Sequence, residues 1–322
     1  MKLTKKYEVG KKIATREAYG DALAEFGGDE RIVVLDADLS KSTKTANFKK
    51  LYPERFVNCG IAEGNMMAVS AGIATTGKIP FASSFAMFAA GRAYEQVRNS
   101  IGYPHLNVKI GATHAGITVG EDGATHQCNE DIGIMRTIPG MVILNPADAA
   151  EARACVKAAI DYYGPVYLRF GRLGVPVIFD EDTFDFEIGK GNLLRGGKDV
   201  SIIATGIMTC EALKAAEILA QEGISARVIN IATIKPIDKD IIISAAKETG
   251  AIVTGEEHNV IGGLGSAVCE TVAEACPVPV IRVGVEDKFG KSGKATELME
   301  EFGLCAANLV AKAKAAVALK NS

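Results

Sequence analysis

Short apolar, β-rich runs alternate with amphipathic helical segments along nearly the whole chain, and this alternation limits the possible folds more than any other feature. In the first half it predicts strands over 31–38, 55–60, 78–85, 105–116 and 141–148 and helices over 63–77, 87–102 and 149–164. Continuous apolar strands separated by helices are typical of a largely parallel sheet that is covered on both faces. The sequence therefore predicts the α/β class.

A crossing rich in Pro, Gly and Asp interrupts this pattern over 165–192, where helical periodicity is lost. We therefore predict two domains, 1–188 and 189–322. The second, smaller domain resumes the alternation, with strands predicted over 200–205, 226–233, 251–258 and 279–285 and helices over 210–223, 265–276 and 301–320.

The charge balance and the cysteines limit the partners and the compartment. The net charge is -3 and no long cationic run is present, so we expect no nucleic-acid partner. The seven cysteines are scattered and contain no CxxC pair, which is typical of reduced thiols in a cytoplasmic protein. The start of the chain lacks an apolar signal core and no later run is long enough to span a bilayer, so we expect no membrane association.

One carboxylate, Glu63, stands among glycines and small apolar residues in GIAEGNMMAVSAGIA, where a helix is predicted to begin. An ionised carboxylate is costly to bury without a partner. Glu63 is therefore either a surface residue that the helix dipole stabilises, or a group whose proton chemistry a ligand requires. Acidic residues are common in first turns, so both interpretations stay open.

An aromatic pair and a polar loop are two further candidate sites. Phe85 and Phe88 are three residues apart and would therefore share a helical face, which suits core packing or a shelf for a flat ring. The Gly-rich loop THAGITVGEDGATHQ contains His114, Asp122 and His126 directly after a predicted strand. Core packing cannot explain such a loop, and ligands of α/β proteins bind at the carboxyl ends of strands, so we predict a functional loop.

Three other observations are weaker. Zinc could be held by His114, His126 and Cys128, but His-x-Cys is an unusual spacing, and we predict no metal site in this chain. The forked guanidinium of arginine matches phosphate oxygens, yet isolated arginines are usually solvated surface residues. Both interpretations therefore stay open for the scattered residues Arg16, Ser42 and Arg169. The segment EEHNVIGGLGSAV contains a GxxG turn without a GxGxxG pattern and is interpreted as a tight turn.

Taken together, these motifs resemble the C-terminal half of transketolase, in the form where the enzyme is split into two chains. ATHAG followed by GEDGATHQ is the most specific part of the resemblance. EEHNVIGGLGSAV is similar to a segment shared with deoxyxylulose-phosphate synthases and the β subunits of 2-oxoacid dehydrogenases. The resemblance implies a pyrimidine-binding domain with a helix-flanked parallel sheet, followed by a smaller α/β transketolase C-terminal domain.

The resemblance also implies which residues contact the cofactor, thiamine diphosphate. Glu63 would hydrogen-bond the N1′ atom of its aminopyrimidine ring, so that the missing partner of this carboxylate would be the cofactor. Phe85 and Phe88 would stack against the ring, and Asp38 would lie beside the active site. Gly64 departs from the family pattern, which usually has a larger polar residue there.

By the same resemblance, the loop residues would contact the sugar. Asp122 would lie near a substrate hydroxyl, and His114 and His126 would act near the carbonyl and the acceptor. The acceptor's terminal phosphate would be held by Arg16, Ser42 and Arg169.

An absence predicts a partner chain. In this superfamily a divalent metal, usually Mg2+, holds the pyrophosphate through a GDG sequence and a later asparagine, and this chain has EDG without that pair. We expect an N-terminal subunit that carries the pyrophosphate and metal site, and a homodimer of this chain within a two-plus-two heterotetramer. The implied activity is transfer of a two-carbon ketol unit from a ketose phosphate to an aldose phosphate, as in the pentose phosphate pathway. The alternatives are a deoxyxylulose-phosphate-synthase-like or 2-oxoacid dehydrogenase β-like subunit, and a non-catalytic subunit that shapes its partner.

Overall fold

Seven strands form the sheet of the first domain, in the order β12-β6-β7-β5-β4-β2-β3. The computed structural model describes residues 7–320. All neighbours in this sheet are parallel except β12, which is antiparallel to β6. The strands are β2 (Ile32–Asp36), β3 (Phe56–Asn58), β4 (Ile79–Phe85), β5 (Lys109–Thr113), β6 (Val142–Leu144), β7 (Val166–Arg169) and β12 (Thr233–Lys235). The predicted α/β class and the five predicted strands of this domain are confirmed.

Helices cover both faces of this sheet, as the apolar strands require. One face packs against α1 (Thr15–Phe26), α3 (Ala46–Leu51) and α7 (Ala149–Asp161). The other packs against α4 (Glu63–Ala74), α6 (Asp131–Arg136) and the segment predicted as one helix over 87–102. That segment is α5 (Tyr94–Gln96) between two π-helical stretches, η2 (Met87–Arg92) and η3 (Val97–Gly102).

Short elements complete the first domain. They are the pair β1 (Lys12–Ala14) and β8 (Gly174–Pro176), the one-turn helices α2 (Ser40–Thr43) and η1 (Pro53–Arg55), and the 3-10 segment η4 (Ile117–Asp122). Both α2 and η4 lie in loops that follow strands of the main sheet.

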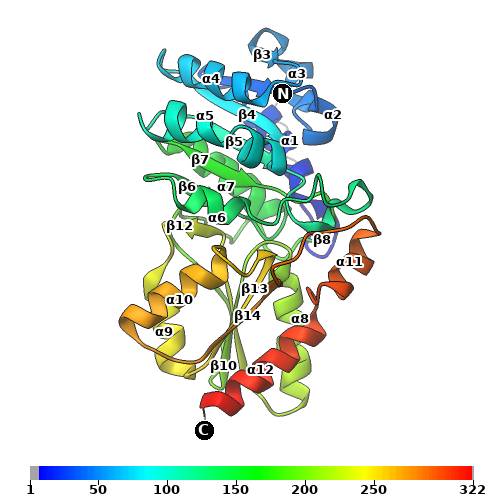
Figure 1. Cartoon of the computed structure of the whole chain (residues 1–322), viewed down its shortest axis with the longest axis vertical. Coiled ribbons are helices and arrows are strands. Elements are labelled where there is room, and N and C mark those ends of the chain that lie inside the picture. The colour runs from blue at the N-terminus through cyan, green and yellow to red at the C-terminus, as the bar shows by residue number, and fades with distance from the viewer. Residues whose placement is uncertain (1–6, 321–322) are drawn as a thin grey trace.

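The second domain has a five-stranded sheet in the order β14-β13-β10-β11-β9, with only β9 antiparallel. Its strands are β9 (Asn192–Arg195), β10 (Val200–Ala204), β11 (Ala226–Asn230), β13 (Ile252–Asn259) and β14 (Val280–Val285). Its helices are α8 (Met208–Gln221), α9 (Lys239–Thr249), α10 (Leu264–Ala275), α11 (Ala295–Glu301) and α12 (Ala306–Lys320). In Figure 1 this unit lies below the first, with α9 and α10 on one side of the sheet and α8 and α12 on the other.

One segment of the described chain, Ala295–Lys320, is long and apolar enough to cross a membrane by length and composition, contrary to the sequence-based expectation. In the structure it is two helices, because α11 ends at Glu301 and α12 begins at Ala306. Leu309, Val310 and Ala313 of α12 are buried in the core of the second domain. This packing accounts for part of the apolar composition of the segment.

The two domains share structure across the predicted boundary at residue 188. Strand β12 belongs to the second half of the sequence, yet it pairs with β6 at the edge of the first sheet. Ile231 and Ile234, on either side of the start of β12, belong to one buried cluster with side chains of α4 and α10. The first sheet is therefore completed by the second half of the chain.

Candidate active site

The carboxyl edge of the first sheet brings together most of the predicted site residues. Asp38 and His114 follow β2 and β5, and Phe85 is the last residue of β4. Arg172, which the sequence interpretation did not single out, follows β7. These four strands are parallel neighbours, so their ends meet at one edge, where α/β proteins bind ligands. Asp38 and His114 also have positive φ angles of 64° and 57°, and such strained backbone clusters at functional sites.

Glu63 is the first residue of α4 and its side chain is almost fully buried, with 1% exposure. Its Oε2 atom accepts a hydrogen bond of 2.8 Å from Nη1 of Arg92, whose side chain is 52% exposed. The prediction that this carboxylate has no partner within the chain is therefore wrong. Gly64 faces the Gln96 side chain, because a Cβ atom there would lie 3.2 Å from Gln96 Oε1. A larger residue at position 64 would need Gln96 to move.

The aromatic pair flanks this carboxylate. The rings of Phe85 and Phe88 are stacked, with centroids 5.8 Å apart and an angle of 16° between their planes. They meet across the junction between β4 and η2, although the sequence argument placed them on one helix. Phe85 is buried, whereas Phe88 is half-buried, and the guanidinium of Arg92 lies 4.5 Å from the Phe88 ring centre. Phe88 therefore offers one face to a flat cation or ring.

The two loop histidines approach the same aromatic pair. The His114 ring stacks on Phe85 with centroids 3.8 Å apart, and the His126 ring meets Phe88 edge-on at 5.4 Å. Nε2 of His114 lies 3.2 Å from Nη1 of Arg16, and its Nδ1 lies 2.9 Å from the hydroxyl of Thr113. Since arginine can only donate, these partners assign the ring proton of a neutral His114 to Nδ1, which donates to Thr113.

Burial and nearby cations keep His114 neutral. Burial, and then the charges of Arg16 and Arg172, lower the pKa of His114 to about 3. Its charge would therefore not change near neutral pH, in contrast to an ordinary histidine with a pKa of about 6.5.

We predict that the ring signals of His114 in an NMR titration stay at their neutral positions between about pH 5 and 8. Because the unfolded chain takes up this proton below about pH 6.5, this residue should make folding less favourable as the pH falls from about 6.5 towards 3. In Arg16→Ala the pKa should rise, yet remain below the ordinary value because burial is the larger cause. A His114 signal that titrates near pH 6.5 in the wild-type chain would contradict the assignment.

Three basic residues surround His114 and form a cationic cluster, defined as Arg16, Lys44 and Arg172. The charges of all three residues lower the pKa of His114. The pKa of Arg16 is itself lowered, mainly by burial and further by the charge of Arg172. Arg16 donates a hydrogen bond of 2.8 Å to the carbonyl of Ser42, and its Nε atom is buried without a partner. Such a cluster is suited to a phosphate group.

Asp122 lies beside this cationic cluster. Its Oδ2 atom is 3.9 Å from Nη1 of Arg172, and its side chain is exposed. Asp38 is also exposed and accepts a hydrogen bond of 2.9 Å from the Asn58 side chain.

Arg169 is not placed with the phosphate-suited groups, so this part of the sequence interpretation is corrected. Its side chain is 3% exposed, and its Nε atom donates to both carboxylate oxygens of Asp131, at 3.1 and 2.9 Å. Nη2 donates to the carbonyl of Glu257 at 2.9 Å. Arg169 is the last residue of β7, whereas Arg172 lies just beyond its end. The sequence interpretation placed this segment in the irregular crossing and predicted no strand that could have separated the two arginines in LRFGR.

The zinc alternative gains no support. Cys128 is fully buried, and burial raises the pKa of its thiol well above the ordinary value. Among residues 7–320, no group of three His, Cys, Asp or Glu side chains is arranged to hold a metal ion.

Comparison with known families agrees with this fold. The family model "Transketolase, pyrimidine binding domain" matches residues 11–177, and "Transketolase, C-terminal domain" matches residues 189–309. The chain therefore belongs to the transketolase family, a family of transferases that use thiamine diphosphate.

Three individual relatives are similar to nearly the whole chain. A solved structure described as "Split gene transketolase, inactive beta4 tetramer" is 58% identical, covers 96% of this chain and 99% of that one, and superposes with a TM-score of 0.90. The "Putative transketolase C-terminal section" of Methanocaldococcus jannaschii is 54% identical over 90% of this chain and 92% of its own length. A 6-deoxy-6-sulfo-D-fructose transketolase subunit from Clostridium sp. strain MSTE9 is 47% identical over 95% of both chains.

The residues around Glu63 fit the pyrimidine end of thiamine diphosphate. Arg92 shows what this place accepts, since its flat N–H-bearing group bonds Glu63 while it lies over Phe88. A protonated aminopyrimidine ring offers the same two features, a donor for the carboxylate and a flat face for the aromatic ring. Glu63, Phe85 and Phe88 would hold that ring once Arg92 has moved.

Proposed function

We propose that this chain is the C-terminal subunit of a thiamine diphosphate-dependent transketolase, which transfers a two-carbon ketol unit from a ketose phosphate to an aldose phosphate. One observation carries the proposal. A single sheet edge combines a buried carboxylate beside stacked aromatic rings with a neutral histidine beside a cationic cluster. The carboxylate and the aromatic rings suit the cofactor's ring, and the histidine and the cationic cluster suit a phosphorylated sugar.

The chain's own residues would bind, orient and exchange protons. Thiamine diphosphate, when bound, supplies the nucleophilic carbon that receives the two-carbon unit. Glu63 would share a proton with the ring nitrogen, and burial would keep that hydrogen bond away from water. Neutral His114 accepts a hydrogen bond from Arg16 at Nε2 and so orients that guanidinium. Asp122 can accept a hydrogen bond from a sugar hydroxyl. Arg16, Lys44 and Arg172 would bind the phosphate, with Ser42 beside Arg16.

We also propose a separate N-terminal subunit that holds the pyrophosphate and Mg2+, in a cytoplasmic two-plus-two assembly. The names of two relatives, a C-terminal section and a subunit, support a two-chain enzyme, as does the inactive tetramer of the related split-gene protein. Exposed apolar side chains near Glu63 support a covering partner, since Ile61 is 78% and Val57 is 38% exposed.

The rival enzymes act on pyruvate or another 2-oxoacid. A 2-oxoacid dehydrogenase β-like subunit would need no cationic cluster for a sugar phosphate, whereas a deoxyxylulose-phosphate synthase also binds a phosphorylated acceptor. The loop with His114 and His126 favours ketol transfer over both. The non-catalytic alternative is disfavoured because Glu63 is present and buried at a place that fits the cofactor's ring.

We expect this chain to transfer ketol units only after mixing with an N-terminal partner that carries the GDG and asparagine pair. The test is an assay of each chain alone and of the mixture, with thiamine diphosphate and Mg2+, using xylulose 5-phosphate with ribose 5-phosphate and, separately, pyruvate. Two donors named for relatives, 6-deoxy-6-sulfo-D-fructose and apulose 4-phosphate, extend the panel. Turnover by this chain alone, or turnover with pyruvate only, would rule out the proposal.

A further inference from the structure

The segment Glu256-Glu257-His258 lies at the end of β13, ahead of the GxxG turn predicted from the sequence. All three side chains are buried, and they lie where the second domain meets the first. Glu256 accepts hydrogen bonds from the amides of Leu264 and Gly265, at 2.6 and 2.8 Å, and so holds the start of α10. Of these three side chains, Glu256 is the one that stabilises a helix of its own domain.

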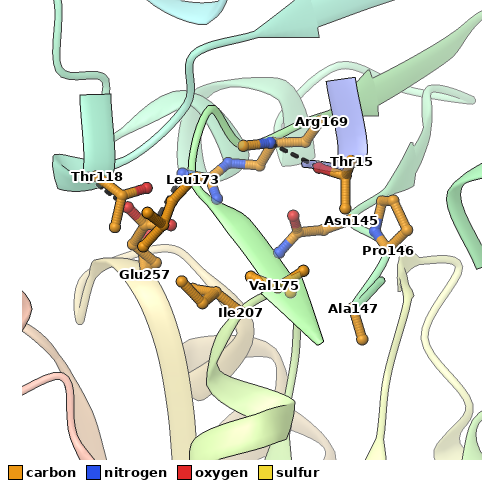
Figure 2. Close-up of a pocket in the computed structure, with 12 residues that line it drawn as sticks. Thr15, Thr118, Asn145, Pro146, Ala147, Arg169, Leu173, Val175, Ile207 and Glu257 are labelled. Atoms are coloured by element: carbon orange, nitrogen blue, oxygen red, sulfur yellow. Dashed lines mark hydrogen bonds between the residues drawn. The ribbon is translucent and has the colours of Figure 1, made fainter. Parts of the chain in front are cut away.

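The next two residues reach into the first domain. Nε2 of His258 accepts a hydrogen bond of 3.3 Å from the amide of Gly133 in α6. Oε1 of Glu257 accepts one of 2.7 Å from the amide of Thr118, in the loop that carries Asp122 and His126. Figure 2 shows Thr118 and Glu257 next to one another at one side of a small cavity between the domains.

The contact between Glu257 and Thr118 is closely fitted. Gly116 lies against the Glu257 carboxylate, and a Cβ atom on Gly116 would approach within 2.3 Å of it. Gly116 also has a φ of +78°, which favours glycine. Arg169 donates to the backbone carbonyl of Glu257, and its charge opposes the rise that burial causes in the pKa of the Glu257 side chain. The misassigned arginine therefore supports this contact.

Other parts of the second domain hold the same loop. Ile117 is fully buried in the cluster formed by α8, α12 and the second sheet. Further along, Nε2 of Gln127 donates to the carbonyl of Lys291 at 2.9 Å. Gly123 faces Ser292, where a Cβ atom would lie 2.5 Å from the Ser292 hydroxyl. The loop 117–127 is thus held at both of its ends by the second domain.

We propose that Glu257 is a positioning residue, through which the second domain holds the loop 117–127 so that Asp122 faces the cationic cluster and His126 meets the aromatic pair. The proposed role in substrate binding rests on the proposed function, whereas the role in ordering the loop does not. Glu257 acts through Thr118, to which it is hydrogen-bonded, and not by direct contact with His114 or the cationic cluster.

Hydrogen exchange of the full chain, followed by mass spectrometry, tests the ordering role without any partner or substrate. Glu257→Ala should speed exchange in peptides covering 117–122 by about 10- to 100-fold, since a bond to a charged acceptor is lost. Glu257→Gln keeps an acceptor oxygen and should restore most of the protection. If Glu257→Ala does not fold, Gln127→Ala removes the hydrogen bond from Gln127 to the carbonyl of Lys291 and should speed exchange in the same loop. Exchange in 117–122 that is unchanged, or that rises equally in β10, would overturn the proposal.

Kinetics of the reconstituted enzyme test the role in substrate binding. Glu257→Ala should raise KM for phosphorylated sugars by about 10-fold or more while thiamine diphosphate affinity, measured by calorimetry, stays unchanged, and Glu257→Gln should rescue KM. Glu297→Ala, an exposed change in α11, is the matched control. An unchanged KM with a loosened loop would overturn the substrate role. Absence of ketol transfer by the wild-type complex would instead count against the proposed function.

Discussion

Replacing Glu63 with alanine should reduce ketol transfer by the assembled enzyme by at least about 100-fold, the usual size of a general acid–base contribution. The carboxylate is buried and accepts a hydrogen bond from Arg92, whose guanidinium lies over the Phe88 ring. Glu63→Gln should also lose most activity, because an amide cannot share a proton with the ring nitrogen as a carboxylate does.

Two measurements separate this effect from misfolding. Loss of a first-turn carboxylate should cost the helix only about 0.3–1 kcal/mol, so the free energy of unfolding should change little beyond that. Glu54→Ala removes an exposed carboxylate from η1 and should leave turnover unchanged. Wild-type turnover in Glu63→Ala, with thiamine diphosphate bound at normal affinity, would refute the assigned role.

Arg169→Ala and Arg172→Ala should have opposite consequences. The first leaves the buried Asp131 carboxylate without its cation and should lower the free energy of unfolding by about 3–5 kcal/mol. The second alters a half-exposed side chain and should change that free energy by no more than about 0.5 kcal/mol. Arg172→Ala should instead raise KM for phosphorylated sugars by about 10- to 100-fold.

Denaturant unfolding measures the first effect, and steady-state kinetics of the reconstituted enzyme measure the second. An acceptor without a phosphate is the internal control, since the penalty in Arg172→Ala should disappear with it. The reverse outcome, a stable Arg169→Ala with raised KM and an unaffected Arg172→Ala, would restore the original assignment of Arg169.

The alternation of apolar strands and helices was sufficient to predict the fold class and most strands, because strands buried on both faces leave a strong pattern. It did not predict β12, a three-residue strand whose partner, β6, lies far away in the sequence. Such a pairing depends on how the two halves of the chain meet. The π-helical turns around α5 were missed for a related reason, since the residue periodicity over 87–102 matches an ordinary helix.

The candidate site could be predicted where residues follow a strand directly, as His114 and Phe85 do. The prediction failed where the partner of a site residue is remote in sequence. Arg92 is 29 residues from Glu63, and only the packing of η2 against α4 brings the two together. Arg169 and Arg172 differ in burial because one lies within β7 and the other beyond it, and a motif alone does not mark that end. The contact of Glu257 with Thr118 spans 139 residues and has no local signal.

The late strand β12 has a consequence for dissecting the protein. A fragment that stops at residue 188 would lose the strand that pairs with β6, and the β6 backbone would be left as an open edge. Open edges recruit strands from other molecules, so such a fragment would tend to aggregate although its own sheet order is intact. The first domain should therefore be expressed with the second half attached, and the chain should not be cut between the two sheets.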